Sequence, residues 1–146
     1  METEPHPRDL ITQTRYWYIF LDPDQKNLGT CIVSLKRESG HLSSLKPGEW
    51  QEFINIVYQL EKSIKKAFKA TLFNWGCFLS EIEENKPLHL EWHVIPRYQQ
   101  KLEFEKTSFS DPCFGKSTIQ ICGETLILPY SLRNKIINKI RENLNI

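Results

Sequence analysis

Histidine and glutamate side chains alternate with apolar residues between positions 88 and 95. The ionisable residues are His89, Glu91 and His93, and a period of two places all three on one face of a β-strand. Imidazole titrates near neutral pH and a carboxylate can take up or release a proton, so this arrangement could perform acid–base chemistry. A half-exposed strand whose polar face meets water has the same pattern, and spacing alone leaves both interpretations open.

The same three residues could also supply metal ligands, because imidazole and carboxylate suit zinc, manganese or iron. Same-face residues on a strand lie about 6.5 Å apart, so His89 and His93 are about 13 Å apart with Glu91 between them. One ion would therefore use two neighbours at most and need ligands from elsewhere. The other histidines, His6 and His41, lie in no strand pattern. We expect no metal and no cofactor.

This stretch resembles the signature of the histidine triad (HIT) superfamily, His-φ-His-φ-His-φ-φ, in which φ is an apolar residue. His89 and His93 stand at its outer positions, and residues 95–98 read Ile-Pro-Arg-Tyr, as in many bacterial and archaeal members. Glu91 stands at the centre, where the family carries the histidine that attacks the α-phosphate of a nucleotide. The chain thus resembles a prokaryotic HIT-like protein with a substituted triad.

Further motifs follow the order of the family between about residues 16 and 115. They are Phe20-Leu21-Asp22-Pro23, Phe73-Asn74-Trp75-Gly76-Cys77, Ser108-Phe109-Ser110-Asp111-Pro112 and Phe114-Gly115. The resemblance implies an α+β, HIT-like fold: a mostly antiparallel sheet with one long helix and a C-terminal helix. It also implies a homodimer.

Carried over residue by residue, the resemblance implies a site for a purine nucleotide or dinucleotide. Asp22 would accept hydrogen bonds from ribose hydroxyls, and Phe20 and Ile32 would help form the base pocket. His93 would contact the α-phosphate, and Asn74 would hydrogen-bond near the scissile phosphate. The residues alone leave other roles open, since the two apolar residues suit any core, the aspartate can form an Asx-turn and the asparagine can satisfy a bulge.

Glu91 alters the chemistry that the resemblance implies, in which His89 would position the central residue. An ionised carboxylate about 4 Å from a phosphate charge meets a repulsion of about 1 kcal/mol in water and about 4 kcal/mol at an effective dielectric of 20. We therefore expect the usual hydrolysis or transfer of nucleotide phosphoanhydrides and phosphoramidates to be weak or lost. Alternatively, Glu91 acts as a general acid or base in an active hydrolase, or forms a mixed anhydride. A further alternative is a dimeric interaction protein with a vestigial cleft.

Length and composition narrow the partners and the location. The 146 residues suit one domain, and we expect a flexible arm over residues 1–14 and a HIT-like domain over residues 15–146. A net charge of +1 offers no strong field for nucleic acid or for an anionic membrane, so we expect neither partner. The four cysteines show no Cys-x-x-Cys spacing and are expected to be reduced, in a cytoplasmic protein without a membrane span.

Alternation and turn residues predict strands over residues 17–21, 30–35, 72–79 and 88–95, and Pro96 ends the last one because proline donates no backbone hydrogen bond. A ribbon is expected over 103–109, a hairpin over 119–128, and a final helix capped by Ser131. Pro47 begins a predicted helix of about five turns, whose exposed side carries charged residues as far as Lys69. Its expected apolar face is Trp50, Phe53, Ile54, Val57, Leu60, Ile64 and Phe68.

Overall fold

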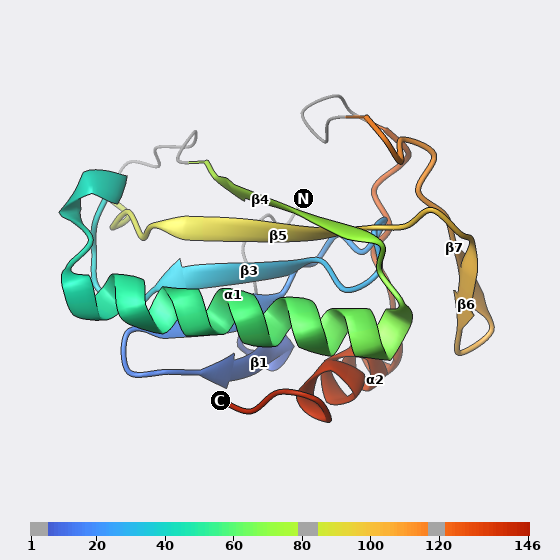
Figure 1. Ribbon diagram of the computed structural model, residues 1–146, viewed down its shortest axis with the longest axis horizontal. Helices are drawn as coiled ribbons and strands as arrows, with labels where there is room; N and C mark the ends of the chain where they lie inside the picture. The colour runs from blue at the N-terminus through green and yellow to red at the C-terminus, as the bar shows by residue number, and fades with distance from the viewer. Residues whose placement is uncertain (1–5, 79–84, 117–121) are drawn as a thin grey trace.

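The strands form one antiparallel sheet and a small separate ribbon (Figure 1). The computed structural model describes residues 6–78, 85–116 and 122–146, and all structural statements concern these residues. Within them the larger sheet has five strands in the order β1-β2-β3-β5-β4. The strands are β1 Leu10–Gln13, β2 Trp17–Leu21, β3 Cys31–Leu35, β4 Leu72–Cys77 and β5 Glu91–Arg97, and the ribbon pairs β6 Leu102–Phe104 with β7 Thr107–Phe109.

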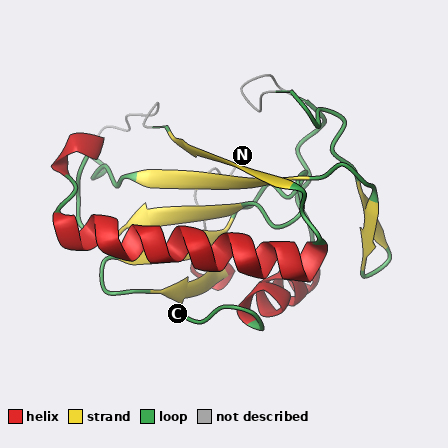
Figure 2. Cartoon of the chain, viewed as in Figure 1, coloured by secondary structure: helices red, strands yellow, loops and turns green. Residues whose placement is uncertain are grey.

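The long helix α1 (Pro47–Phe68) lies across one face of the sheet, as Figure 2 shows. The C-terminal helix α2 (Tyr130–Arg141) packs against α1 and β1 on the side away from β4 (Figure 1). Two short 3-10 turns, η1 (Pro7–Asp9) and η2 (Leu42–Ser44), complete the elements of the described residues. This mixed architecture with a mostly antiparallel sheet confirms the predicted fold class.

The first turn of α1 is fixed by proline and by a carboxylate. Pro47 has the backbone angle of a first helical residue, and Glu49 accepts a hydrogen bond from the N–H of Lys46 at 2.8 Å. The helix ends at Lys69, whose φ of 61° lies in the left-handed region. Between sheet and helices lies an apolar core that includes Trp17, Ile19, Leu21, Val33, Leu35, Phe53, Ile56, Leu60, Ile64, Val94, Ile136 and Ile140.

The helix begins at Pro47 as predicted, but its buried face is rotated from the predicted one. Phe53 and Leu60 are buried as expected, and Ile56 is fully buried although it was not expected to be. Ile54 is 67% exposed and Trp50 is 37% exposed, so these two assignments to the core were wrong. Successive helical residues point about 100° apart, and here the sheet covers the side of Phe53 and leaves the side of Ile54 exposed. An apolar strip therefore remains on the outer side of α1.

The strand that carries the candidate site begins and ends later than predicted. β5 starts at Glu91 rather than at residue 88, and Pro96 lies inside it, paired with Phe73 of β4. The pairing of β5 with β3 ends at Val94, so at Pro96 the strand needs no N–H on that side. The side chain of Asn27 donates to the Pro96 carbonyl at 2.8 Å and covers this edge.

The two ends of the chain also differ from the prediction. Residues Leu10–Gln13 form β1 and pair with β2, so the sheet begins inside the segment expected to be a flexible arm. Helix α2 begins at Tyr130 with Pro129 as its capping position, so Ser131 lies within the helix and does not cap it. No helix among the described residues has both the length and the apolar character needed to cross a bilayer. The cytoplasmic location stays a prediction.

The segment before α2 differs as well. Residues 119–121 of the expected hairpin lie outside the described residues, and residues 122–128 contain no strand; Ile127 instead forms an isolated bridge with Asp24. Cys113 and Cys122 form a disulfide with Cα atoms 5.9 Å apart, so the prediction of four reduced cysteines was wrong for this pair. The spacing of the cysteines in the sequence did not indicate that Cys113 and Cys122 lie close together.

Candidate functional site

A series of directly paired residues crosses the sheet on the face away from α1. On one side His93 pairs with Ile32, which pairs with Phe20. On the other side His93 pairs with Gly76 of β4. Directly paired residues point to the same face, and the next residue of β5, Trp92, points to the opposite face and packs on α1. We call Phe20, Ile32, His93 and Gly76 the His93 row.

His93 lies between two carboxylates, and the three residues form the His93 group: Asp22, His93 and Glu91. Nδ1 of His93 is 3.6 Å from Oδ2 of Asp22, and Nε2 is 3.9 Å from Oε2 of Glu91. The side chains of Asp22, His93 and Glu91 are 16%, 30% and 34% exposed. The interaction with Asp22 raises the pKa of His93 above its usual value, burial lowers it, and the charge of Glu91 raises it further. Two carboxylates thus face a single imidazole.

The turn after β2 holds Asp22 in place. Its Oδ1 accepts a hydrogen bond from the N–H of Asp24 at 2.8 Å, as in an Asx-turn, while Oδ2 faces His93. The side chain of Gln25 donates to the Asp22 carbonyl at 2.8 Å and closes the same turn. Asp22 therefore forms the Asx-turn and contacts His93 at the same time, and its ribose-binding role stays a prediction.

His89 lies before β5 and contacts a different part of the chain. Its Nδ1 is 3.0 Å from the carbonyl oxygen of Leu35, the last residue of β3. The N–H of Leu35 donates to the carbonyl of Leu90 at 2.8 Å, so the main chain beside His89 is held at the same end of the sheet. The structure brings Glu91 close to His93 and anchors His89 at Leu35.

The apolar part of this face comes from β2 and β3. Ile32 is 1% exposed, whereas Phe20 is half-buried with its ring 5.8 Å from that of Tyr18. Phe20 therefore presents apolar surface on this face, and the buried Ile32 lies between Phe20 and His93 in the row.

Asn74 belongs to a second group of polar residues, the Arg97 group: Asn74, Arg97 and Asp111. The guanidinium of Arg97 donates to Oδ1 of Asn74 at 2.9 Å and to both oxygens of Asp111 at 2.6 and 3.1 Å. It also donates to the carbonyls of Cys113 and Lys116, so it joins β4 and β5 to the loop that follows β7. Asn74 itself is exposed, and this contact fixes the orientation of its carboxamide.

The central ion pair of this group is buried. The side chains of Arg97 and Asp111 are each 4% exposed. Burial raises the pKa of the Asp111 carboxyl, but hydrogen bonds from Arg97 and from the N–H of Tyr98, together with the Arg97 charge, hold it below its usual value. A bidentate arginine–carboxylate contact also restricts both side chains geometrically.

Arg97 and Asp111 both lie within sequence motifs of the family, but no role was predicted for either residue. A signal was present, because the alternation of His93 and Glu91 continues through Ile95 to Arg97 with the same period of two. Ending the strand at Pro96 concealed it. Among the described residues, no set of three or more His, Cys, Asp or Glu side chains is arranged to hold a metal ion.

The sheet and the pattern on β5 together define the class of protein. The model of the HIT domain family matches residues 3–100, more than half of the 146-residue chain, and the chain belongs to this family. No curated protein matches the sequence.

Solved structures of the family have a similar fold. A histidine triad protein of Sinorhizobium meliloti is 20% identical with a TM-score of 0.72, covering 94% of this chain and 91% of its own. A hypothetical histidine triad nucleotide-binding protein of Sulfolobus tokodaii is 17% identical with a TM-score of 0.62, covering 92% and 82%. A diadenosine triphosphate hydrolase of Plasmodium falciparum is 14% identical with a TM-score of 0.64, covering 94% and 76%. At these identities the likeness shows a common fold.

Proposed function

We propose that this chain binds a purine nucleotide or dinucleotide on the sheet face away from α1, with hydrolase or transferase activity that is weak or lost. The observation that carries this proposal is the position of His93 between Asp22 and Glu91, at 3.6 and 3.9 Å. Membership of the HIT domain family supports the nucleotide, as do the names of two similar structures, a nucleotide-binding protein and a diadenosine triphosphate hydrolase.

The ligand lies along the His93 row. Phe20, which is half-buried, contacts the base, and the buried Ile32 completes the apolar part of the row between Phe20 and His93. Asp22 accepts hydrogen bonds from ribose hydroxyls at the end of β2, and His93 donates to the α-phosphate. Asn74, two residues along β4 from Gly76, lies near the scissile bond. This assignment gives the ribose and the phosphates of the ligand partners of complementary chemistry.

Glu91 weakens the chemistry by its charge. It faces the imidazole that would contact the phosphate, and an ionised carboxylate repels an anionic phosphate by about 1 kcal/mol in water at 4 Å, and by more in a drier site. It also lacks the neutral nitrogen with which a central histidine attacks phosphorus. We therefore expect Glu91 to reduce catalysis more than it reduces nucleotide binding.

Calorimetry with AMP, ADP and diadenosine triphosphate tests the binding. We expect measurable affinity for at least one of them, and a loss of about tenfold in Asp22→Ala, which removes a ribose acceptor. Glu105→Ala is the matched control, because this carboxylate is 46% exposed in a surface pair with Lys135. No binding of any adenine ligand at millimolar concentration would exclude the proposal for adenine.

A second candidate function is hydrolysis with Glu91 as general acid or base. It is favoured by the contact between Glu91 and His93, since a carboxylate next to a protonated imidazole can take a proton from an attacking water. Turnover of a fluorogenic adenylate distinguishes the two candidates. A wild-type rate that disappears in Glu91→Ala would establish the second and contradict the first.

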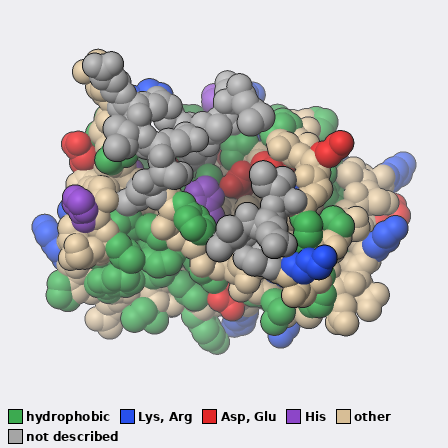
Figure 3. All heavy atoms as spheres, turned by 90° about the horizontal axis from the view of Figure 1, so that it is seen from above, with side chains coloured by type: hydrophobic (Ala, Val, Ile, Leu, Met, Phe, Trp, Pro, Cys, Tyr) green, Lys and Arg blue, Asp and Glu red, His purple; other side chains and the backbone are tan. Residues whose placement is uncertain are grey.

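We also propose that two copies associate through the outer surface of α1 and β4. Strand β4 is at the edge of the sheet, where its outer backbone groups can pair with the same strand of a second copy. Beside it a groove of about 630 Å³ is lined by Ile54, Val57, Tyr58, Glu61, Lys62, Lys65, Thr71, Leu72 and Phe73. In the view onto this edge, hydrophobic side chains gather over part of the surface (Figure 3).

The composition of the groove suits a second copy. Ile54, Tyr58 and Leu72 are 67%, 63% and 57% exposed, which is unusual for large apolar side chains on one surface. Glu61 and Lys65 carry opposite charges and can meet each other across a twofold axis. Size-exclusion chromatography with light scattering should show a dimer for the wild type and a monomer for Ile54→Glu. Ile146→Glu, at an exposed apolar residue of the C terminus, is the control that should stay dimeric; a monomeric wild type would contradict the proposal.

A further inference from the structure

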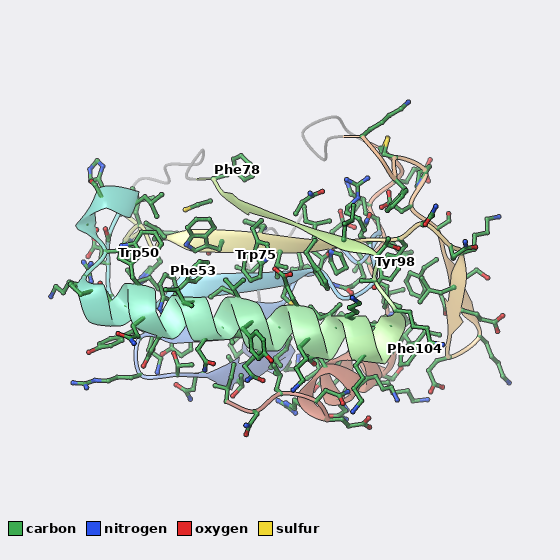
Figure 4. The ribbon with its side chains drawn as sticks, in the orientation of Figure 1. Trp50, Phe53, Trp75, Phe78, Tyr98 and Phe104 are labelled. Carbon is green, nitrogen blue, oxygen red and sulfur yellow. A yellow bond between two sulfur atoms is a disulfide. The ribbon has the colours of Figure 1, made fainter. Side chains whose placement is uncertain are left out.

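An aromatic side chain lies over the end of the His93 row. Phe78 follows β4 directly, and a Cβ atom added to Gly76 would lie 2.2 Å from one carbon of the Phe78 ring and 2.8 Å from another. The ring therefore occupies the space that a side chain at Gly76 would fill. Figure 4 shows Phe78 beyond β4, apart from Trp75 and Phe53, which lie between the sheet and α1.

The position of this ring follows from the register of the sheet. Gly76 is the direct partner of His93, so the face of Gly76 that Phe78 covers is the face that carries the His93 group. Neighbouring strands are about 4.8 Å apart, so the ring is about one strand spacing from His93. Phe20 lies about two spacings away in the opposite direction. The two aromatic residues thus flank His93 along one row.

The ring is also available to a ligand. Phe78 is 60% exposed, although its ring rests on Gly76. An exposed aromatic face beside a polar group attracts a second planar ring, since stacking on a base is favourable for every base. A side chain at Gly76 would remove this arrangement, and glycine permits it.

We propose that Phe78 forms a second ring-binding subsite, which selects ligands that carry a planar ring on the far side of the phosphates from the nucleoside. This inference rests on the proposed nucleotide site. A nucleoside placed against Phe20 with its phosphate at His93 directs the remainder of the ligand towards Gly76 and Phe78, because these residues continue the same row. The favoured ligand class is a nucleoside phosphate with a second nucleoside or another aromatic group at its end.

Calorimetry with AMP and with diadenosine triphosphate tests the subsite in the full-length chain. In Phe78→Ala we expect the affinity for diadenosine triphosphate to fall about tenfold and that for AMP to change less than twofold, because AMP has no second ring. Phe78→Trp should retain the preference. Gly76→Ala should reduce it without removing the ring, because the new Cβ displaces the phenyl group. Tyr130→Ala, at an aromatic residue 40% exposed on α2, is the control.

The outcomes separate this subsite from the nucleotide site itself. Equal losses for both ligands in Phe78→Ala, with an unchanged melting temperature, would overturn the subsite, as would an unchanged affinity for both. Wild-type binding of AMP with no gain from the second nucleoside would overturn the subsite alone. Wild-type binding of neither ligand would overturn the nucleotide site and the subsite together.

Discussion

Two groups of polar residues on the same face of the sheet differ in burial. In the Arg97 group, the ion pair is 4% exposed on both sides and one guanidinium meets one carboxylate. In the His93 group, the side chains are 16% to 34% exposed and two carboxylates meet one imidazole. The buried group can hold strands and loop in position. The more exposed group is the one that we propose meets a ligand.

The side chains of Asn74 and Asp22, which both lie near the His93 row, are held in place in different ways. Asn74 is oriented by Arg97, which is itself fixed by five hydrogen bonds to side chains and carbonyls. Asp22 is oriented by its own turn, and only one of its oxygens faces His93. A mutation in the Arg97 group should therefore act mainly on stability, and one in the His93 group mainly on binding and titration.

The largest expected effect is on folding. Arg97→Ala should lower the free energy of unfolding by about 3 to 5 kcal/mol, because it leaves Asp111 buried without its cation. Lys135→Ala removes a cation from a pair that is 57% and 46% exposed and should cost less than about 1 kcal/mol. Urea denaturation measures both. Equal small losses would show that burial does not distinguish the Arg97 group.

The next effect is on ligand binding. Glu91→Gln removes one of the two carboxylates beside His93 and should raise the affinity for AMP about five- to tenfold, with little change for adenosine, which has no phosphate. Calorimetry at low and at high salt measures it, and the gain should shrink as salt screens the charge. A gain of the same size for adenosine would contradict the electrostatic explanation.

The smallest effect is on the titration of His93. Its pKa in the folded protein is raised, first by Asp22, so the protonated ring stabilises the fold fully below the unfolded pKa of about 6.5. This contribution is lost as the pH rises through the folded pKa. NMR titration should show a higher pKa in the wild type than in Asp22→Asn, and a smaller decrease in Glu91→Gln. If the pKa of His93 were unchanged in Asp22→Asn, the contact between Asp22 and His93 would not exist in solution.

Much of this fold could be predicted from the sequence because local patterns agree with one another. Alternation located β2 and β3, and proline with acidic residues located the first turn of α1. The exposed side of α1 could not be predicted, since Ile54 and Phe53 are both apolar and only the position of the sheet decides between them. The end of β5 was predicted wrongly at Pro96 for a related reason. Proline is tolerated there because the pairing of β5 with β3 ends at Val94, and only the assembled sheet shows where that pairing ends.

The site could be predicted only in part. The period of two placed Glu91 and His93 on one face, but His89 lies beyond the strand and contacts Leu35. The partnership of Arg97 with Asp111 joins residues 14 positions apart through a loop, and no local pattern specifies it. The position of the Phe78 ring over Gly76 likewise depends on a side-chain orientation and not on residue type.

The central claim is that Glu91, in an otherwise intact nucleotide site, is what suppresses catalysis. Turnover of a fluorogenic adenylate by Glu91→His, measured beside the wild type and beside Glu91→Ala, tests it most directly. We expect a rate near background for the wild type and for Glu91→Ala, and a clear gain of at least about tenfold, equal to about 1.4 kcal/mol, for Glu91→His. A folded Glu91→His variant that binds AMP but remains inactive, or an active wild type, would contradict it.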